Sequence, residues 1–194
     1  MALLPLSAVP AKAQDADIES LESLSRLFRS AYQQAAPGVV LIKTSSHRTV
    51  QGRRLPPSHP EIGGSGSGTI VSPDGYILSN YHVVGHADSI QVTLADRRTF
   101  AAQVVGFDSL IDIALLKVEA NNLPMAQLGD SDGLQIGDWV LAIGHPLGMG
   151  STLTHGIVSA LNRQADVFRS PQGQTESFGR YSIESFIQTN AVIN

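Results

Sequence analysis

The chain has 194 residues, and 42% of them are hydrophobic, which is enough apolar material for one large core or two small ones. Its formal net charge is −4 and its basic residues adjoin one another only in pairs, so the composition argues against a nucleic-acid partner. The absence of cysteine excludes disulfide bonds, thiolate metal sites and a cysteine nucleophile.

The N-terminal segment, Met1 to Gln14, has two interpretations. It starts with a mostly apolar stretch, and Ala11-Lys12-Ala13 has the small-x-small pattern of a signal-peptide cleavage site. The basic residues that open such a signal are missing, so the segment is either the end of an export signal or a disordered terminus. No apolar run reaches the roughly 18 residues of a membrane-spanning helix, and we expect no membrane span.

Asp15 to Ala36 is predicted to form one short amphipathic helix. Acidic side chains crowd its start and arginines follow later, as the helix dipole favours. Pro37-Gly38 then ends the helical pattern. The residues that recur at the spacing of one helical face are Ile18, Leu21, Leu24, Leu27, Phe28 and Tyr32.

From Pro37 onward the pattern is that of short strands separated by turns. Ser72-Pro73-Asp74-Gly75 has the composition of a tight turn, and Ala95-Asp96-Arg97-Arg98 can close a hairpin. His47 to Gly64 and Gln164 to Gly179 are expected to be long surface loops. Strand after strand without intervening helices predicts an all-β fold, either a sandwich or a barrel. The expected strands are Val39 to Thr44, Thr69 to Val71, Tyr76 to Leu78, Ile90 to Leu94, Phe100 to Val105, Ile113 to Val118, Val140 to Ile143 and Thr152 to Leu161.

His82 and Asp112 are the leading candidates for catalysis. Asp112 lies between two isoleucines at the start of an apolar strand, where a carboxylate is costly unless a donor faces it. His82 ends an earlier strand, and its Nδ1–H could donate to that carboxylate while Nε2 faces a substrate. The residues alone leave open a surface histidine and an aspartate that only caps a turn.

Several motifs, taken in order along the chain, resemble the HtrA/Deg (DegP-like) family of trypsin-like serine proteases. The run Gly66 to Val84 resembles the histidine region of that family, and Asp112 to Val118 resembles its aspartate strand. Further matches are Leu128 to Asp132, Ile136 to Gly144, Thr154 to Ala160 and Phe186 to Asn194. One departure is Asn190, where an aspartate is common in the family.

The resemblance implies a trypsin-like double antiparallel β-barrel. After the segment 1–14 and the helix 15–36, residues 37–123 would form a complete first barrel. Residues 124–194 would form the first part of a second barrel. Catalysis would then take place at the junction of the two barrels.

The resemblance also implies a serine endopeptidase of protein quality control that cleaves unfolded or misfolded polypeptides. His82 and Asp112 would be two members of its triad, and the serine would follow Asn194 by four residues, so we expect the isolated chain to be inactive. Ile193 matches a position that lines the pocket for the substrate's P1 side chain. A periplasmic or otherwise exported location and a homotrimer or higher oligomer are further implications. The alternative is an inactive protease-like chaperone or binding module.

Two weaker candidates are set aside. Gly63 to Gly68 contains serines, but neither satisfies Gly-x-Ser-x-Gly, and we interpret the segment as flexible backbone leading into a barrel strand. His82 and His86 are four apart, but the residues between them are poor helix formers and no Glu follows His82, so we expect no metal site and no cofactor. The histidines to which we assign no role are His47, His59, His145 and His155.

Overall fold

The computed structural model describes residues 11–46, 49–50, 53–54, 62–145, 150–163 and 186–193. The chain divides into two units, Met1–Gln34 and Ala35–Asn194. The first unit contains most of helix α1 (Ala11–Ala35), which begins four residues before the predicted start at Asp15. Leu21 and Leu27 of this helix are exposed. A short 3₁₀ turn, η1 (Ala36–Gly38), follows the helix at the predicted Pro-Gly stop.

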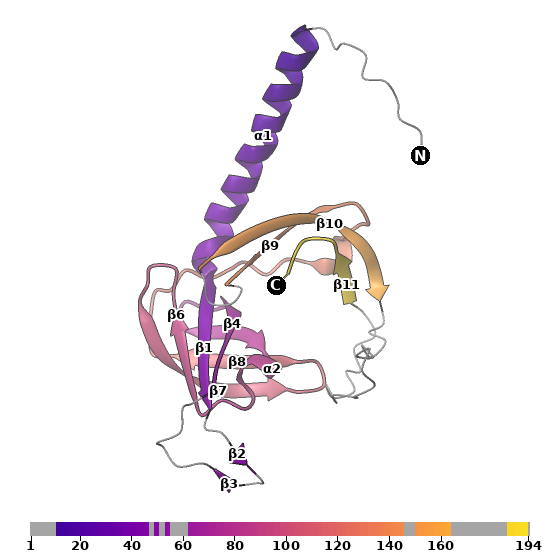
Figure 1. The fold of residues 1–194 in the computed structure, drawn as a ribbon. Helices are drawn as coiled ribbons and strands as arrows, with labels where there is room; N and C mark the ends of the chain where they lie inside the picture. Colours follow the sequence, from indigo (N-terminus) through magenta and orange to yellow (C-terminus); the bar gives the residue numbers. More distant parts are fainter. Residues whose placement is uncertain are drawn as a thin grey trace. The chain divides into compact units, whose positions relative to one another are not determined.

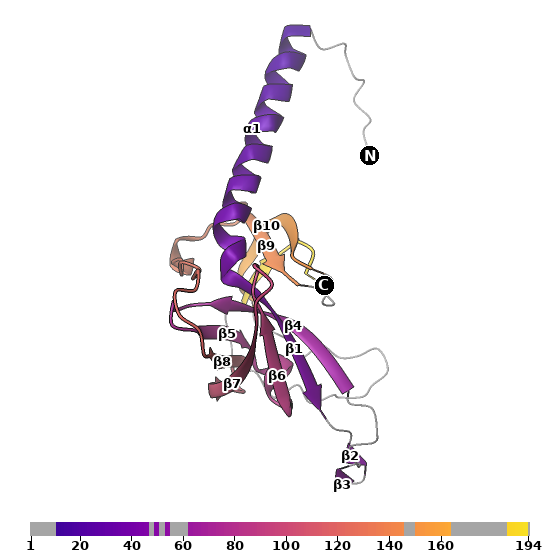
Figure 2. The same ribbon diagram turned by 90° about the vertical axis from the view of Figure 1, so that its left-hand side faces the viewer.

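Six antiparallel strands of the second unit close into a barrel (Figures 1 and 2), in the order β1-β4-β5-β8-β7-β6. The complete first barrel that the family resemblance implied is therefore confirmed. Two further short strands, β2 (Thr49–Val50) and β3 (Arg53–Arg54), pair within a segment that was predicted to be a loop. The strands of the barrel are β1 (Val39–Ser46), β4 (Ile62–Ile70), β5 (Tyr76–Asn80), β6 (Ser89–Thr93), β7 (Thr99–Asp108) and β8 (Ile113–Val118).

The interior of the barrel is filled by branched aliphatic side chains. Alternate residues of β6 and β8 are buried, which is the period-two pattern of a strand with one face on a core. These residues stabilise the barrel through the apolar area that they remove from water. The largest fully buried side chains of the barrel and of the adjoining one-turn helix α2 (Tyr81–Val84) are Val40, Ile42, Ile70, Ile77, Val84, Val92, Leu116 and Val118.

The glycine-rich segment Gly63–Gly68 differs from the prediction, because it is part of strand β4 and not a flexible lead-in. It pairs residue by residue with β1, from Ser45 opposite Gly63 to Val40 opposite Gly68. A Cβ on Gly66 would lie 2.6 Å from Cγ1 of Val83, so the absence of a side chain allows close packing here. Backbone pairing and close packing hold this strand together where apolar side chains are missing.

Both predicted turns are confirmed. The Gly75 amide donates to the Ser72 carbonyl at 3.2 Å, and Gly75 adopts a φ of +102°, which a residue with a side chain rarely takes. In the second turn, the Leu94 amide donates to the Arg98 carbonyl at 2.9 Å and closes the hairpin between β6 and β7.

A separate three-stranded sheet follows the barrel, in the order β11-β10-β9. It consists of β9 (Trp139–Gly144), β10 (Thr152–Arg163) and β11 (Phe186–Thr189), and a short 3₁₀ turn, η2 (Ser131–Gly133), precedes it. Strand β11 was not among the predicted strands. A closed barrel followed by a partial second sheet confirms the predicted fold class.

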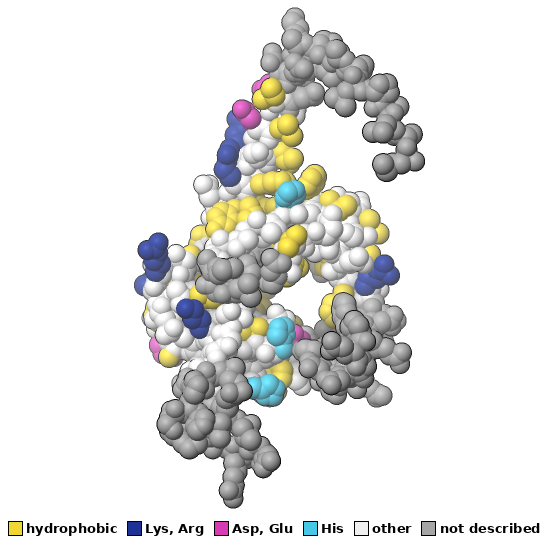
Figure 3. All heavy atoms as spheres, viewed as in Figure 1, with side chains coloured by type: hydrophobic (Ala, Val, Ile, Leu, Met, Phe, Trp, Pro, Cys, Tyr) yellow, Lys and Arg dark blue, Asp and Glu magenta, His cyan; other side chains and the backbone are white. Residues whose placement is uncertain are grey.

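The surface of the described residues has two features that bear on function. Over the barrel and the second sheet, Lys and Arg side chains lie apart from one another on the face drawn in Figure 3 and form no basic patch there. Among the helices that the structure describes, none has both the length and the apolar character required to cross a bilayer.

Candidate active site

His82 lies in a one-turn helix, α2 (Tyr81–Val84), directly after β5. The prediction that His82 ends a strand was therefore wrong, because strand β5 ends at Asn80 and His82 lies in the helix that follows it. The first amides of a helix have no partners within it. Here the Tyr81 amide donates to the Asp112 carbonyl at 3.1 Å and the His82 amide donates to Asp112 Oδ1 at 2.8 Å. Asp112 thus supports a turn that lies 30 residues earlier in the chain.

The side chains of His82 and Asp112 meet. His82 Nδ1 lies 2.6 Å from Asp112 Oδ2, and the same oxygen accepts from Asn80 Nδ2 at 3.1 Å. The Asp112 side chain is only 17% exposed, so these donors compensate the carboxylate for its lost hydration. The imidazole is 54% exposed, and the contact at Nδ1 leaves Nε2 as the ring nitrogen available to a further partner.

The connection between β7 and β8 sets the direction of Asp112. Asp112 adopts a φ of +54°, in the left-handed region that Asp and Asn tolerate better than most residues. The preceding turn is held by Asp108 Oδ1, which accepts from the Leu110 amide at 2.8 Å. This backbone conformation allows the carbonyl and the carboxylate of Asp112 both to accept hydrogen bonds from backbone amides of α2.

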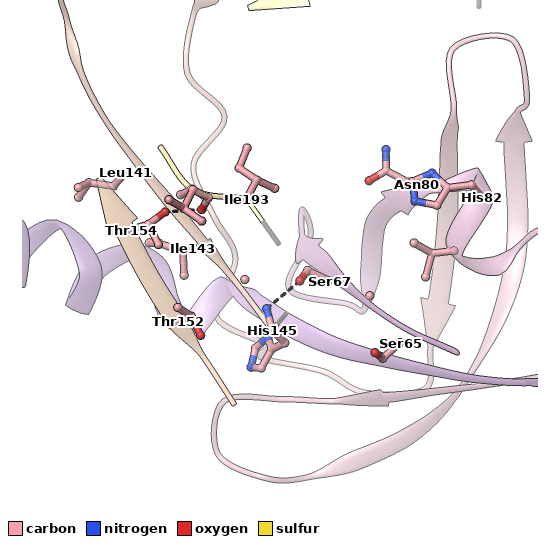
Figure 4. A pocket seen from close by; sticks show the side chains of 15 residues that line it. Ser65, Ser67, Asn80, His82, Leu141, Ile143, His145, Thr152, Thr154 and Ile193 are labelled. Carbon is pink, nitrogen blue, oxygen red and sulfur yellow. Dashed lines mark hydrogen bonds between the residues drawn. The ribbon is translucent and has the colours of Figure 1, made fainter. Parts of the chain in front are cut away.

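His82 opens on a cleft of about 610 Å³ between the barrel and the second sheet. In Figure 4, Asn80 and His82 lie on one side of the view, while Leu141, Ile143 and Ile193 lie on the other. Ile193 therefore lines the same cleft as His82, and its side chain is exposed. Thr154 Oγ1 donates to the Val192 carbonyl at 2.7 Å and holds this last segment against β10.

His145 lines the cleft directly after β9 and is only 9% exposed. Its backbone amide donates to Ser67 Oγ at 2.8 Å, whereas its Nδ1 is buried without a hydrogen-bond partner. Burial lowers the pKa of His145 below the ordinary histidine value of 6.5, because the charged ring would lose its hydration. The imidazole is therefore neutral at pH 7.

A chain with a closed barrel, a second sheet and a paired His and Asp at their junction also matches a known family by sequence. The model of the trypsin-like peptidase domain matches residues 66–194. The chain belongs to the trypsin-like peptidase family. The match begins at the barrel strand β4 and includes both His82 and Asp112.

Relatives within this family are HtrA/Deg proteases, as the sequence motifs predicted. A protein of Pseudomonas fulva named "Probable periplasmic serine endoprotease DegP-like" is 41% identical over 91% of the chain and 32% of its own length. A Marinomonas protein of the same name is 46% identical over 74% of the chain and 28% of its own length. The solved structure "HtrA-type protease AlgW with decapeptide" is 38% identical with a TM-score of 0.68, over 86% of the chain and 52% of that structure's chain. The chain thus spans less than half the length of the curated relatives it matches here.

Two residues of this candidate site were not found by sequence reasoning. Asn80 binds the same carboxylate oxygen as His82, and its position two residues before His82 was the only signal for it. Ser67 was dismissed with its glycine-rich segment, although it lines the cleft and binds His145. In both cases the contact joins positions that are far apart in the chain.

The remaining histidines lie apart from this arrangement. His86 makes an edge contact with the Tyr81 ring at 6.2 Å between centroids, and His155 stacks on Trp139 at 5.8 Å. His47 and His59 lie outside the described residues. Within the described part of the chain, no three His, Asp or Glu side chains come together in a way that could hold a metal ion.

Proposed function

We propose that the full-length protein is a serine endopeptidase in which His82 and Asp112 complete a triad with a serine that follows Asn194. The observation that carries this proposal is the contact of 2.6 Å between His82 Nδ1 and Asp112 Oδ2 at the edge of the cleft. A carboxylate can only accept, so Nδ1 carries the proton and Nε2 is left as the base. Nε2 would take the proton of the serine hydroxyl and later give it to the leaving amine.

Asp112 has two functions in this mechanism. It holds the imidazole in the tautomer that leaves Nε2 unprotonated, and its negative charge stabilises the imidazolium that forms during acylation. Asn80 and the His82 amide keep the carboxylate in place, since both donate to its oxygens. This arrangement is ready before substrate arrives, as electrostatic catalysis requires.

The substrates in this proposal are unfolded or misfolded polypeptides. The relatives named as endoproteases, and a related structure named with a decapeptide, support a polypeptide substrate. Ile193, on the side of the cleft with Leu141 and Ile143, would contact the P1 side chain and favour a small aliphatic residue. The names of the relatives also support a periplasmic or otherwise exported location. A homotrimer or higher oligomer belongs to the same proposal, and light scattering of the full-length protein would test it.

We also propose domain boundaries at residues 37–123 and 124–194 for the two barrels. Leu123 is 4% exposed and belongs to the core cluster of the first barrel. Its amide donates to the Pro73 carbonyl at 3.0 Å, which ties the end of this segment to the turn before β5.

The first test is the residues that follow Asn194, where the proposal requires a serine within Gly-Asn-Ser-Gly-Gly. The second is cleavage of a fluorescent protein in folded and permanently unfolded forms by the purified full-length enzyme. We expect cleavage of the unfolded form only. Another residue at the serine position, together with binding but no cleavage of the unfolded form, would instead indicate a chaperone or binding module.

A further inference from the structure

Ser67 makes a contact that crosses the candidate cleft. It lies on β4 in the barrel, and its hydroxyl accepts the amide of His145, which is 78 residues away at the end of β9. In Figure 4 the dashed line between these two residues lies between the side of the view with His82 and the side with Ile193. The bond therefore joins the barrel wall of the cleft to the wall formed by the second sheet.

The two walls are in close contact at this point. A Cβ on Gly144 would lie 2.9 Å from Ser67 Oγ, so a side chain there would push the hydroxyl out of its present position. His145 is only 9% exposed, which means that little water is present to replace the hydroxyl as the acceptor of its amide. This part-buried hydrogen bond therefore contributes to the separation of the two walls.

On the barrel side, Ser67 is connected to the His82–Asp112 pair. Its carbonyl accepts from Ser79 Oγ at 2.9 Å. Ser79 directly precedes Asn80, whose side chain donates to the Asp112 carboxylate. A shift of β4 at Ser67 would therefore move the end of β5, which leads directly into the helix α2 that carries His82.

On the other side, the contact is connected to the last described segment of the chain. Gly144 pairs with Thr152 in the ladder between β9 and β10. Two residues further along β10, Thr154 donates to the Val192 carbonyl. The bond at Ser67 thus completes a continuous path of hydrogen bonds and strand pairs from Asp112 to the segment next to Ile193.

We propose that Ser67 is a positioning residue that sets the distance between the His82 imidazole and the wall of the cleft that carries the nucleophile. This inference rests on the proposed function, in which the serine follows Asn194. In this role Ser67 acts through Gly144 and His145 on one side and through Ser79 on the other. Because proton transfer requires close approach of the imidazole to the serine hydroxyl, a small change in this distance is costly.

The test compares Ser67→Ala with Ser45→Ala in the full-length protein. Ser45 is a matched control, since it lies on the neighbouring barrel strand β1, loses a side-chain hydrogen bond to Ser89 and does not line the cleft. For each variant, kcat and KM with a peptide substrate, the rate of labelling by a fluorophosphonate and the melting temperature are measured. We expect Ser67→Ala to lower kcat and the labelling rate roughly 10- to 100-fold with KM within about twofold. Ser45→Ala should change none of the kinetic values more than about twofold.

A second variant approaches the same contact from the opposite wall. Gly144→Ala places a methyl group against the Ser67 hydroxyl, and we expect it to lower kcat by a similar factor. If Ser67→Ala does not fold, the kcat and the labelling rate of Gly144→Ala test the inference in its place. Variants that melt at lower temperature but, as folded molecules, are labelled as fast as Ser45→Ala would overturn the inference and leave the proposed function intact. A wild-type protein that is not labelled would overturn both.

Discussion

Replacement of Asp112 by Asn tests the carboxylate without disturbing the backbone. Asp112 has a φ of +54°, which Asn also tolerates, whereas Ala would add strain. In Asp112→Asn the remaining oxygen can still accept the His82 amide, as Oδ1 does at 2.8 Å. The new NH₂ group then takes the place of Oδ2, which faces two donors, His82 Nδ1 at 2.6 Å and Asn80 Nδ2 at 3.1 Å.

The new NH₂ group is itself a donor, so it cannot accept a hydrogen bond from either of the two donors that face it. The imidazole therefore moves its proton from Nδ1 to Nε2, and Nε2 can no longer accept the proton of the nucleophile. We expect kcat of the full-length Asp112→Asn enzyme to fall about 10⁴-fold, as for loss of the aspartate charge in an equivalent arrangement. This factor corresponds to about 5 kcal/mol of transition-state stabilisation.

The assay is steady-state cleavage of a peptide substrate, with melting temperatures measured in parallel. Asp108→Asn is the control, because it removes the same charge four residues earlier, at the end of β7, where the Asp108 carboxylate holds the turn that follows. We expect Asp108→Asn to keep kcat within about threefold, since its carboxylate has no contact with the candidate pair. An Asp112→Asn enzyme with kcat within tenfold of the wild type would refute the tautomer argument.

Three further predictions concern the stability of the second unit. Leu116→Ala, at a side chain with no exposed area, should lower the free energy of unfolding by about 2–5 kcal/mol, whereas Leu110→Ala, at a side chain 56% exposed, should change it by less than about 0.5 kcal/mol. Gly75→Ala should lower it by at least about 1–2 kcal/mol, because the φ of +102° disfavours a side chain and the new Cβ would collide with the Val118 carbonyl. Urea unfolding of the full-length protein measures both effects. Because burial lowers the pKa of His145, this imidazole binds a proton more readily in the unfolded chain than in the folded one. The free energy of unfolding should therefore fall as the pH drops below about 6.5, and it should continue to fall until the lower pKa of the folded state is passed. His145→Gln should remove this part of the pH dependence of the urea midpoint.

Each of these predictions has an outcome that contradicts it. An equal loss of stability in Leu116→Ala and Leu110→Ala would mean that the barrel core is not where the structure has it. A Gly75→Ala protein as stable as the wild type would contradict the turn geometry. A pH dependence that is unchanged in His145→Gln would show that this imidazole is not buried in a neutral state.

The local pattern of apolar and polar residues was sufficient to predict strands whose side chains alternate between buried and exposed. Strand β8 was predicted residue for residue as Ile113–Val118, because Ala114, Leu116 and Val118 all face the core. The tight turns were predicted from Pro and Gly at fixed positions. The choice of a barrel over a sandwich came only from the family resemblance, since pairing between distant strands leaves no local signal.

The errors occurred where contacts distant in the chain determine the local structure. Strand β4 has few apolar side chains, and its pairing with β1 and the close approach of Val83 to Gly66 hold it as a strand. Helix α2 contains two valines, which are poor helix formers, yet Asp112 satisfies the amides at its start. The same applies to the site, since Asn80 was missed because its partner lies 32 residues away.

The most direct test of the proposed proton relay is the rate at which a fluorophosphonate labels the full-length protein, compared between wild type, His82→Ala and His86→Ala. His86 is the control, since it lies one turn further on and does not line the cleft with His82. We predict labelling of a single serine in the wild type, a rate within about twofold in His86→Ala, and a loss of at least about 10³-fold in His82→Ala. Labelling of His82→Ala at the wild-type rate would contradict the assignment of His82 as the base.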